Sequence, residues 1–390
     1  MFEVIIIGAG PAGLMAGIMS EKKTLIIEKN DIAGKKLLIT GGGRCNVTNN
    51  KENRDFLNQI EHNKKYLYST INNFGPKEII NFFKTHNVSL KEEEDGKMFP
   101  KANKSFVIKE ALLNAYKGKI NYNEDVEKII KENDYYIVIT NKNEYKTQKL
   151  VIATGGSSYK ITGSTGDNLK FAKMLKQPVT EIYPAEIGVK LKKPTDIPGQ
   201  SIDNVIVKAD KRKKEGNLLY THTGLSGSSI MLISEYIFKD KINEIEIDLL
   251  PKYNEEEIKN ILNNYDRNKE VHTFLEQYFS KRFSEYLLNY INLEKNIKIK
   301  QLNHKELNKL VETIKHIKYN VKNNEKIDLA YVTAGGIDLK YINTKTFEST
   351  INKNLYFVGE ALDIHGPIGG YNITLALSTG YSAGVSLWEK

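Results

Sequence analysis

Cysteine is almost missing from this chain of 390 residues, which contains only Cys45. A single thiol excludes an internal disulfide, a CxxC redox pair and an iron–sulfur cluster held by cysteines alone. The seven histidines show no HxxxH or HExxH spacing, so we expect no metal site. Nine prolines and 40% hydrophobic residues predict a chain that is folded almost throughout.

Long hydrophobic runs are missing as well. Residues 4–19 are apolar but interrupted by glycine, and they fall short of the roughly 20 residues that span a bilayer. The opening MFEVIIIG has no basic segment before its apolar run, which is not the pattern of a signal peptide. We therefore expect a soluble cytoplasmic protein without a membrane partner.

Arginine is scarce: the 57 basic residues include five arginines, and the formal net charge is +9. A basic chain favours a polyanionic partner such as nucleic acid. The alternative explanation of the many lysines is the codon usage of an AT-rich genome, which would also account for the abundance of Asn and Ile in the chain. The segment KADKRKK gathers basic residues on an expected turn, which is either a solvated loop or the place where RNA would bind. These residues are Lys208, Lys211, Arg212, Lys213 and Lys214.

The first thirty residues are typical of a βαβ unit. FEVIII at 2–7 predicts a buried parallel strand, 11–20 a helix and 24–29 a second strand. GAGPAG joins the first strand to the helix with GxGxxG spacing, and Glu28 follows twenty positions after its first glycine.

Each glycine of this motif has a physical role when a dinucleotide binds. Gly8 makes the turn, Gly10 lets the backbone approach a pyrophosphate, and Gly13 lets the helix pack close to the strand. The helix N-terminus offers N–H groups to the pyrophosphate, and Glu28 would accept hydrogen bonds from an adenosine ribose. Glycine-rich turns also occur without ligands, but this context favours dinucleotide binding.

The rest of the chain favours FAD over NAD as the dinucleotide. An NAD dehydrogenase normally continues with further helix–strand units, whereas here a glycine cluster follows and a β-meander at 126–153 returns to an ATGG turn. Near the C-terminus, YFVGEALD ends a strand at Gly359-Glu360. Asp363 follows closely, and such carboxylates can meet a ribityl hydroxyl or a pyrophosphate-bound water.

Glycine content divides the chain into three parts. Glycines are frequent before about residue 188 and again after 328, while 189–327 alternates short strands with lysine-rich helices. We expect an α/β fold in which a Rossmann-type FAD-binding domain comprises 1–188 and 328–390. A mixed α+β substrate domain, 189–327, is inserted into it. Residues 51–118 are charged and predicted to be mainly helical.

The motifs together resemble the YhiN/BaiN-like flavoproteins, a bacterial family with a glutathione-reductase-type FAD fold and an inserted domain. The motifs that carry the resemblance are GAGPAG (8–13), GKKLLITGGGRCNVTN (34–49), VIATGGSSYKITGSTGD (151–167), LLYTHTGLSG (218–227), VTAGGIDL (332–339) and NLYFVGEALDIHGPIGGYN (354–372). They span nearly the whole chain. Departures such as Lys160, in place of a usual proline, and His365 touch none of the residues expected to bind FAD, and they bear on the substrate side instead.

The motifs and the resemblance together give a set of expected FAD-binding residues. These are Gly8, Gly10, Pro11, Ala12, Gly13, Glu28, Lys29, Lys36, Thr40, Gly42, Gly43, Arg44, Cys45, Asn46, Val126, Thr154, Gly155, Gly359, Glu360, Asp363, Gly369, Gly370, Tyr371, Asn372 and Ile373.

Two residues are candidates for proton transfer. Cys45 follows the triplet Gly41–Gly43 and is interpreted in three ways: as a buried packing residue, as a general acid facing the substrate, or as a thiolate that tunes the flavin. Arg44 beside it is either a ligand contact or a structural clamp. His222 in the insert is the second candidate because imidazole titrates near neutral pH, and its alternative role is to cap the following helix.

The resemblance implies reduction of a conjugated C=C bond. Some members act on a uridine of large-subunit ribosomal RNA, giving dihydrouridine, and others on small enones. We favour the RNA because the charge, the basic turn and the many tyrosines suit a polyanion whose base stacks on the flavin. The small-molecule reductase is the alternative, and a non-catalytic FAD sensor is a third hypothesis. No second GxGxxG unit is present, so NADPH or NADH would dock transiently as the reductant.

Overall fold

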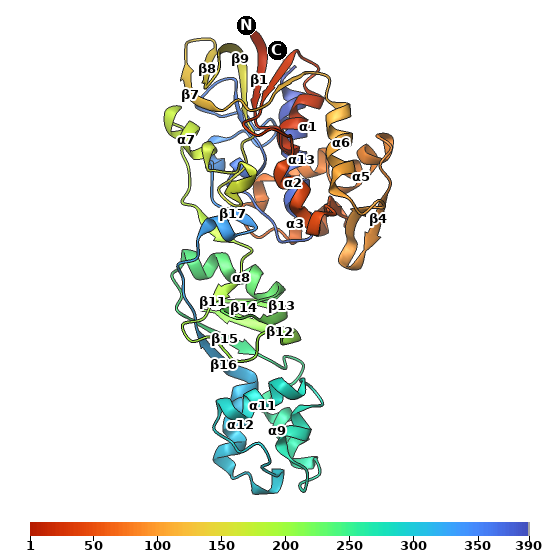
Figure 1. The fold of residues 1–390 in the computed structure, drawn as a ribbon, viewed down its shortest axis with the longest axis vertical. Helices are drawn as coiled ribbons and strands as arrows, with labels where there is room; N and C mark the ends of the chain where they lie inside the picture. The colour runs from red at the N-terminus through yellow and green to blue at the C-terminus, as the bar shows by residue number, and fades with distance from the viewer. Residues whose placement is uncertain (389–390) are drawn as a thin grey trace. The chain divides into compact units, whose positions relative to one another are not determined.

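The computed structural model describes residues 1–388, and the chain divides into two compact units (Figure 1). Unit 1 comprises Met1–Tyr183 and the chain from Ile327 onward, and unit 2 is Pro184–Lys326. These boundaries lie within five residues of those expected from the sequence. The assignment of the cofactor to unit 1 and of the substrate to unit 2 stays a prediction.

Unit 1 is built on a mixed sheet with the order β6-β2-β1-β9-β8-β7. Its strands are β1 (Phe2–Ile7), β2 (Thr24–Ile27), β6 (Lys119–Asn121), β7 (Val126–Lys131), β8 (Tyr136–Thr140) and β9 (Glu144–Ile152), and β18 (Leu355–Phe357) pairs with β9. β1 runs parallel to β2 and to β9, while β7 and β8 are antiparallel. β9 pairs with β8 through its first half and with β18 through its second. The predicted βαβ unit and β-meander are confirmed.

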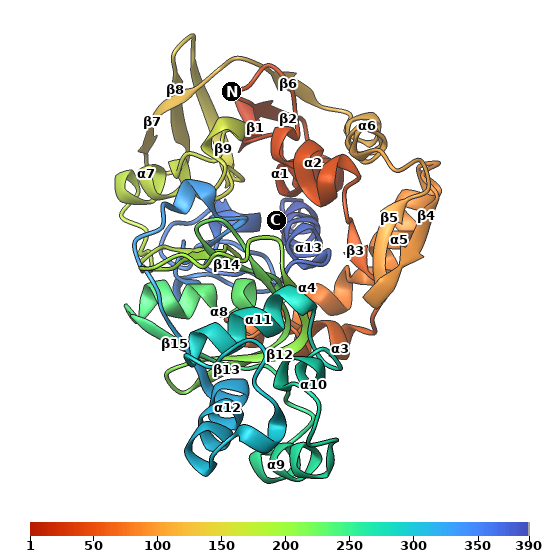
Figure 2. The same ribbon diagram turned by 60° about the horizontal axis from the view of Figure 1, so that its bottom comes forward.

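Two helices from opposite ends of the chain pack side by side in unit 1 (Figures 1 and 2), α1 (Pro11–Met19) and α13 (Tyr371–Ser386). A Cβ on Gly380 would lie 2.3 Å from the Ala12 carbonyl oxygen, and one on Gly384 would lie 2.6 Å from that of Ala16. The two contacts advance in the same direction along both helices, so α1 and α13 are parallel. Glycine therefore permits the close contact that joins the two termini in one unit.

The region 51–118 is less helical than the sequence indicated. It contains α3 (Asn53–Asn58), α4 (Tyr68–Asn73), α5 (Pro76–Thr85) and α6 (Ser105–Ala115), but also the hairpin of β4 (Leu90–Glu93) and β5 (Lys97–Pro100). β5 also pairs with β3 (Thr48–Asn49). The turn uses Asp95 and Gly96, both with positive φ, and Asp-Gly is a hairpin signal that outweighs the helical charge pattern.

Unit 2 holds an antiparallel sheet with the order β11-β14-β13-β12-β15-β16. The strands are β11 (Val189–Lys190), β12 (Ser201–Ala209), β13 (Arg212–Tyr220), β14 (Gly224–Ser226), β15 (Glu244–Asp248) and β16 (Ile317–Asn320). α8 (Ser228–Lys239) packs on β12 and β13. Between β15 and β16 the chain forms α9 (Glu255–Asn264), α10 (Val271–Leu275), α11 (Lys281–Tyr290) and α12 (His304–His316), which gather at one end of the sheet (Figure 1). This is the mixed α+β insert that the sequence predicted.

Tyrosines hold α11 against this sheet. The hydroxyl of Tyr319 lies 2.8 Å from that of Tyr220 and 3.1 Å from that of Tyr286, and Tyr220 is fully buried. Phe283 packs beside them, with ring centroids 5.5 Å from Tyr220. Several of the tyrosines counted in favour of base stacking thus belong to the core of unit 2.

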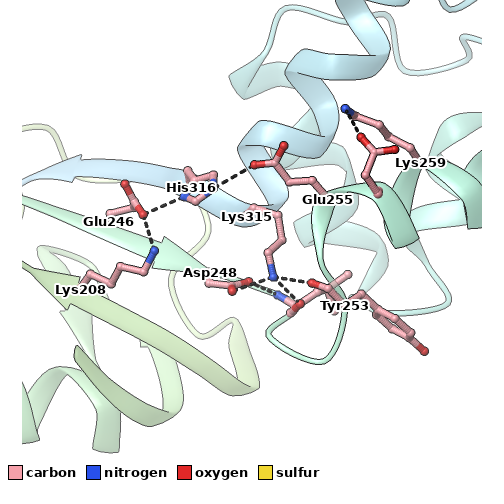
Figure 3. Close-up of polar contacts among 10 residues, drawn as sticks. Lys208, Glu246, Asp248, Tyr253, Glu255, Lys259, Lys315 and His316 are labelled. Carbon is pink, nitrogen blue, oxygen red and sulfur yellow. Dashed lines mark hydrogen bonds and ion pairs between the residues drawn. The ribbon is translucent and has the colours of Figure 1, made fainter.

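A buried ion pair joins the end of α12 to β15 (Figure 3). Lys315 Nζ lies 2.7 Å from Asp248 Oδ2 and donates to the carbonyls of Leu250 and Tyr253 at 2.9 and 2.6 Å. The Lys315 and Asp248 side chains are only 9% and 12% exposed. Because a charge removed from water needs a partner, each of the two residues fixes the position of the other.

The next residue, His316, lies between two carboxylates. Its Nδ1 is 2.8 Å from Glu246 Oε1, and its Nε2 is 3.2 Å from Glu255 Oε1 (Figure 3). Lys208 also donates to Glu246 at 2.8 Å. Burial opposes the ionisation of Glu246, but the hydrogen bonds from Lys208 and His316 outweigh it and lower the pKa of this carboxyl.

Asp248→Ala tests the buried pair. The substitution leaves the Lys315 ammonium buried without a counter-charge, and we expect the free energy of unfolding to fall by about 3 kcal/mol. Glu256→Ala is the matched control: it removes an exposed partner of Lys259, 3.3 Å away, and should change stability by less than about 1 kcal/mol. Urea denaturation followed by circular dichroism measures both, and equal losses would contradict the assignment.

Among residues 1–388, the structure contains no helix with the length and apolar character needed to cross a membrane.

Candidate functional site

The GAGPAG loop connects β1 to α1 and leaves one position open. A Cβ on Gly8 would lie 2.5 Å from the carbonyl oxygen of Ala153, and one on Gly13 would lie 2.0 Å from that of Gly8. These two glycines are therefore required by the packing of the protein itself. A Cβ on Gly10 would meet no atom within 4 Å, so space for a ligand lies at Gly10.

Two helix N-termini face the same way in unit 1. α1 starts after Gly10 with Pro11 at its first position, and α13 starts after Gly370; neither has a side-chain cap. Gly380 lies beside Ala12, so the start of α13 lies eight residues, or about 12 Å at 1.5 Å per residue, beyond the start of α1. Both ends offer N–H groups and positive dipole ends to a ligand, and their offset suits an elongated one.

Glu28 follows β2 and its carboxylate binds the loop. Its Oε2 accepts from Ala9 N at 2.8 Å, and its Oε1 accepts from the backbone and side-chain nitrogens of Asn30 at 2.8 and 2.7 Å. Because a carboxylate can accept about four hydrogen bonds, Glu28 keeps capacity for a ribose hydroxyl.

Two further residues expected to bind FAD, Lys29 and Val126, belong to segments next to Glu28. The ammonium of Lys29 is 2.6 Å from both Thr165 Oγ1 and Asp167 Oδ2, so the structure assigns its charge to α7 (Asp167–Met174). Val126 is the first residue of β7. Two positions earlier, the N–H of Glu124 donates to the Glu28 carbonyl at 3.1 Å. This hydrogen bond brings the chain just before β7 close to Glu28, although β7 and β2 lie on different sides of β1 in the sheet.

A polar cluster joins three of the predicted FAD segments. Lys36 Nζ lies 2.7 Å from Ser158 Oγ and 2.8 Å from Glu360 Oε2, although Lys36 and Glu360 are 324 positions apart. Glu360 Oε1 accepts from Ser158 Oγ at 3.1 Å and from Thr333 N at 2.9 Å. The segments 34–49, 151–167 and 354–372 thus meet at Glu360, which sequence reasoning did not connect to Lys36.

The glycine triplet that precedes Cys45 is required by backbone geometry. Gly41, Gly42 and Gly43 have φ values of +55°, +66° and +84°, a region that glycine adopts without strain. A Cβ on Gly41 would lie 2.9 Å from Asn46 N, whereas one on Gly42 would meet no atom within 4 Å. Thr40, at the start of this turn, donates its hydroxyl proton to the carbonyl of Leu37 at 2.7 Å. Gly42 is therefore the second open backbone position of the site.

Arg44 acts as a clamp within the protein. Its Nη1 lies 2.9 Å from Glu93 Oε1, and its guanidinium lies 4.1 Å from the ring centroid of Phe99. Both partners belong to the β4–β5 hairpin. Of the two interpretations of Arg44, this geometry favours the structural one.

Cys45 is enclosed by protein atoms alone. It is fully buried, its φ is +64°, and its N–H donates to the Thr40 carbonyl at 2.9 Å. Burial raises the pKa of its thiol to about 12, and a side-chain hydrogen bond with Thr40 lowers this pKa by a smaller amount. A thiol in this environment stays protonated, which argues against the thiolate interpretation. Full burial favours the packing interpretation over a thiol facing a substrate.

Buried polar atoms mark where a ligand would complete the site. Asn46 Oδ1, Asn49 Oδ1 and Thr154 Oγ1 have no hydrogen-bond partner within the part of the chain that the structure describes. Buried polar groups are normally paired, so such atoms call for a partner. Gly155 next to Thr154 has φ +72°. These atoms, the open glycines and the two uncapped helices fit an extended dinucleotide such as FAD.

The last predicted FAD segment begins after β18. Gly359 N donates to Thr379 Oγ1 at 2.9 Å, and Asn372 closes the loop by bonding both the N–H and the carbonyl of Gly366, at 2.9 and 2.7 Å. Gly369 and Gly370 have φ values of +134° and +93°. Tyr371, Asn372 and Ile373 form the first turn of α13, so their backbone N–H groups belong to the uncapped helix end.

Asp363 in this segment is buried and pairs with a residue that sequence reasoning missed. Its Oδ1 lies 2.8 Å from His62 Nε2. Burial opposes the ionisation of Asp363, but hydrogen bonds from His62 and Thr180 outweigh it and hold the pKa of this carboxyl below its ordinary value. No sequence signal links positions 62 and 363. Among residues 1–388 the structure contains no group of three or more His, Cys, Asp or Glu side chains placed to hold a metal.

His222 lies in unit 2, exposed, in the turn between β13 and β14. The turn is closed by Thr221 N donating to the Gly224 carbonyl and by Gly224 N donating to Thr221 Oγ1. α8 begins at Ser228 after Gly227, so His222 does not cap that helix.

The basic segment forms the β12–β13 hairpin, with Asp210 and Lys211 at its turn. Lys208 and Lys213 stand directly opposite each other, and Lys211 and Lys213 are exposed. The Arg212 guanidinium lies 3.7 Å from the ring centroid of Tyr236, and the Lys214 ammonium lies 5.9 Å from it. Lys211, Arg212 and Lys213 are exposed, but the Arg212 guanidinium also lies 3.9 Å from Asp240 Oδ2, so Lys211 and Lys213 are the residues of this hairpin that we consider for binding a polyanion.

Comparison with known proteins places this site in a family. The profile described as the HI0933-like protein Rossmann domain matches residues 2–386. The chain belongs to the HI0933-like family. Its fold is accordingly a Rossmann-type FAD-binding domain with an inserted α+β domain, and the family resemblance drawn from the motifs is confirmed.

Two curated relatives of this HI0933-like protein extend along its whole length. The ribosomal RNA dihydrouridine synthase of Escherichia coli K12 is 28% identical over 99% of this chain and 98% of its own. The 3-dehydro-bile acid delta(4,6)-reductase of Clostridium scindens is 26% identical over all of both chains. The solved 3-ketosteroid delta1-dehydrogenase of Sterolibacterium denitrificans aligns over 99% of both chains with a TM-score of 0.54 and 11% identity, which shows a shared fold.

Gly10→Ala separates ligand binding from folding. Because a Cβ at Gly10 meets no protein atom, the free energy of unfolding of the apoprotein should change by less than about 1 kcal/mol. FAD affinity should fall by about tenfold or more, since the methyl group occupies the space beside the helix end. Gly13→Ala, which would contact the Gly8 carbonyl, should instead cost about 2 kcal/mol or more of stability. Urea denaturation and FAD fluorescence titration measure the two quantities, and unchanged FAD binding by Gly10→Ala would contradict this placement.

The stability of unit 1 should depend on pH through Asp363. Because the folded pKa of Asp363 is lowered, its ionised form stabilises the fold above the unfolded pKa of about 3.9. That stabilisation is lost as pH falls through the folded pKa. The difference in unfolding free energy between neutral and acidic solution should therefore be smaller for Asp363→Asn than for the unaltered protein. Urea denaturation at both pH values tests this, and identical differences would refute it.

Proposed function

We propose that the protein is an FAD-dependent reductase that converts a uridine of large-subunit ribosomal RNA to dihydrouridine, with NADPH or NADH as the reductant. The observation that carries this proposal is the similarity to the Escherichia coli ribosomal RNA dihydrouridine synthase over nearly the full length of both chains. A similarity of this extent includes unit 2 as well as unit 1, so the relative contains both parts of the architecture.

Unit 1 supplies the residues that would hold FAD. The α1 N-terminus at Gly10 would bind the pyrophosphate, Glu28 the adenosine ribose, and the α13 N-terminus at Tyr371 the flavin ring. A bound flavin supplies a hydride, and the protein supplies orientation and proton management. Lys36 and Glu360 fix the loops around this region relative to one another.

The β12–β13 hairpin of unit 2 is the part we assign to RNA. Lys213 stands opposite Lys208, and like charges in this position destabilise a sheet. Glu246 neutralises Lys208, whereas Lys211 and Lys213 remain exposed on the hairpin. Phosphate groups would relieve this repulsion, which is why we place the RNA backbone here.

A second candidate function is the reduction of a small conjugated enone. It is favoured by the equally complete similarity to the Clostridium scindens bile acid reductase. The reaction class is the same in both cases, because uracil and an enone each present a C=C bond conjugated to a carbonyl group. The two candidates differ in whether unit 2 must bind a polyanion.

Mass spectrometry of large-subunit ribosomal RNA from a deletion strain tests the proposal directly. We expect one uridine to lose its two-hydrogen mass increment and to regain it when the gene is restored. Purified protein with NADPH should restore the same increment in that RNA. An unchanged RNA, together with enone turnover that competing RNA does not inhibit, would establish the second candidate instead. A flavin that no substrate reoxidises would point to the sensor.

Charge reversal on the hairpin tests the RNA site. The double variant Lys211→Glu and Lys213→Glu removes two phosphate contacts, so the slope of log affinity against log salt should fall in magnitude by about 2. The control variant Lys305→Glu and Lys322→Glu makes the same change in net charge at exposed positions elsewhere in unit 2 and should leave the slope unaltered. Salt-dependent RNA titration measures both, and equal slopes in the two variants would remove the hairpin from the RNA site.

A further inference from the structure

A second polar cluster of unit 1 combines two imidazoles with one buried carboxylate. His62 Nε2 lies 2.8 Å from Asp363 Oδ1, and the rings of His62 and His365 stack with centroids 5.5 Å apart and planes at 28°. Asn63 Nδ2 donates to the Asp363 carbonyl at 2.8 Å. Asp363 and His365 are 5% and 7% exposed, whereas the His62 side chain is 29% exposed. His62 is therefore the member of this cluster that solvent and a substrate can reach.

The segment that carries His62 follows the loop that leads into α13. Phe56 stacks on Tyr371, with ring centroids 4.7 Å apart, and six residues later His62 contacts Asp363. As one segment advances from 56 to 62, its partner recedes from 371 to 363, so the two run antiparallel. This places His62 against Asp363, which lies in the loop between Glu360, the partner of Lys36, and the uncapped α13 N-terminus.

Asp363 holds the imidazole by one nitrogen. Its carboxylate faces Nε2 of His62, and its own backbone is fixed because Asp363 N donates to the Ile337 carbonyl at 3.0 Å. A buried carboxylate in this position fixes the orientation of an imidazole. Asn63 Nδ2 lies 3.1 Å from the same Nε2, so both of these contacts are made by Nε2, and we take Nδ1 as the nitrogen that serves a substrate.

The other two candidates for proton transfer are less suitable. Cys45 is fully enclosed by protein, so its thiol does not face a ligand space. His222 lies in an exposed turn, and the contacts that close this turn come from Thr221 and Gly224 rather than from a carboxylate that would orient the ring. Reduction of a conjugated C=C bond requires a proton donor, because a hydride alone leaves a carbanion at the α-carbon.

We propose that His62, oriented by Asp363, is the residue that protonates the α-carbon of the substrate during this reduction. This inference rests on the proposed function, whichever of its two substrates is correct. As the hydride of the reduced flavin adds to the β-carbon, the π-electron pair moves toward the α-carbon and takes the Nδ1 proton of the His62 imidazolium. The N–H bond breaks as the new C–H bond forms. His62 is left neutral and regains a proton from water, while NADPH or NADH provides the two electrons for the next cycle.

The test separates proton transfer from hydride supply. Holoenzyme is reduced with one equivalent of dithionite under nitrogen and mixed with ribosomal RNA from the deletion strain or with 2-cyclohexenone, and reoxidation of the flavin is followed. We expect His62→Gln to slow reoxidation by about a hundredfold or more, within the range that general acids contribute. His304→Gln is the matched control, an identical change at an exposed histidine of α12 in unit 2, and it should react like the unaltered protein.

Two further readouts distinguish a proton donor from a structural residue. The FAD dissociation constant and the urea midpoint of His62→Gln should match those of the unaltered protein. In deuterium oxide the unaltered protein should place deuterium on one face of the α-carbon, whereas His62→Gln, in which water replaces the donor, should give a mixture of both faces.

The possible results distinguish an error in the role of His62 from an error in the proposed function. Reoxidation of His62→Gln at the unaltered rate, or with the same deuterium stereochemistry, overturns the assignment of His62 and leaves the proposed function intact. Slow reoxidation accompanied by an equally large loss of FAD affinity also overturns it, in favour of a structural role. Absence of reoxidation in the unaltered protein by both substrates overturns the proposed function, and the role of His62 with it.

Discussion

Unit 1 depends on the contact between α1 and α13. A Cβ on Gly380 or Gly384 would lie within 2.6 Å of backbone oxygen atoms of α1, so glycine is what allows the two helices to touch. The contact sets both helices parallel and brings two uncapped N-termini to the same side, offset by about 12 Å along the common direction. Because the helices come from opposite ends of the chain, the site exists only when the chain folds as a whole.

In the loop that holds the single cysteine, the conformation of the turn and its packing account for residues that could also have had a chemical role. Gly41, Gly42, Gly43 and Cys45 all have positive φ, which is strained for cysteine and not for glycine. The tight turn buries the thiol completely and leaves Gly42 open. Arg44 and Cys45, which the sequence offered for ligand contact or proton transfer, thus have structural contacts: Arg44 pairs with Glu93, and Cys45 is buried in the turn. His62, which the sequence did not single out, contacts the buried Asp363.

Much of the fold could be predicted from the sequence because its signals are local. The βαβ unit was predicted from the GxGxxG spacing, and the strands of the meander from their β-branched runs. The insert was predicted from glycine density, at 189–327, and the structure has unit 2 at Pro184–Lys326. The β4–β5 hairpin was missed, although Asp95-Gly96 signals it, because the surrounding charges resemble an exposed helix. The contacts of Lys36 with Glu360 and of His62 with Asp363 join positions about 300 residues apart, and no local pattern encodes them. Lys29 and Lys208 were assigned to ligands but pair with Asp167 and Glu246, because a carboxylate partner is visible only in three dimensions.

The central claim is that two parallel helix ends in unit 1 bind the two halves of one FAD molecule. Titration of the apoprotein with FAD and, separately, with FMN tests it most directly. If α1 binds the pyrophosphate and α13 the flavin, FAD should bind with one-to-one stoichiometry and FMN much more weakly, since FMN lacks the adenosine half. Equal affinity for the two flavins, or no binding of either, would contradict the claim.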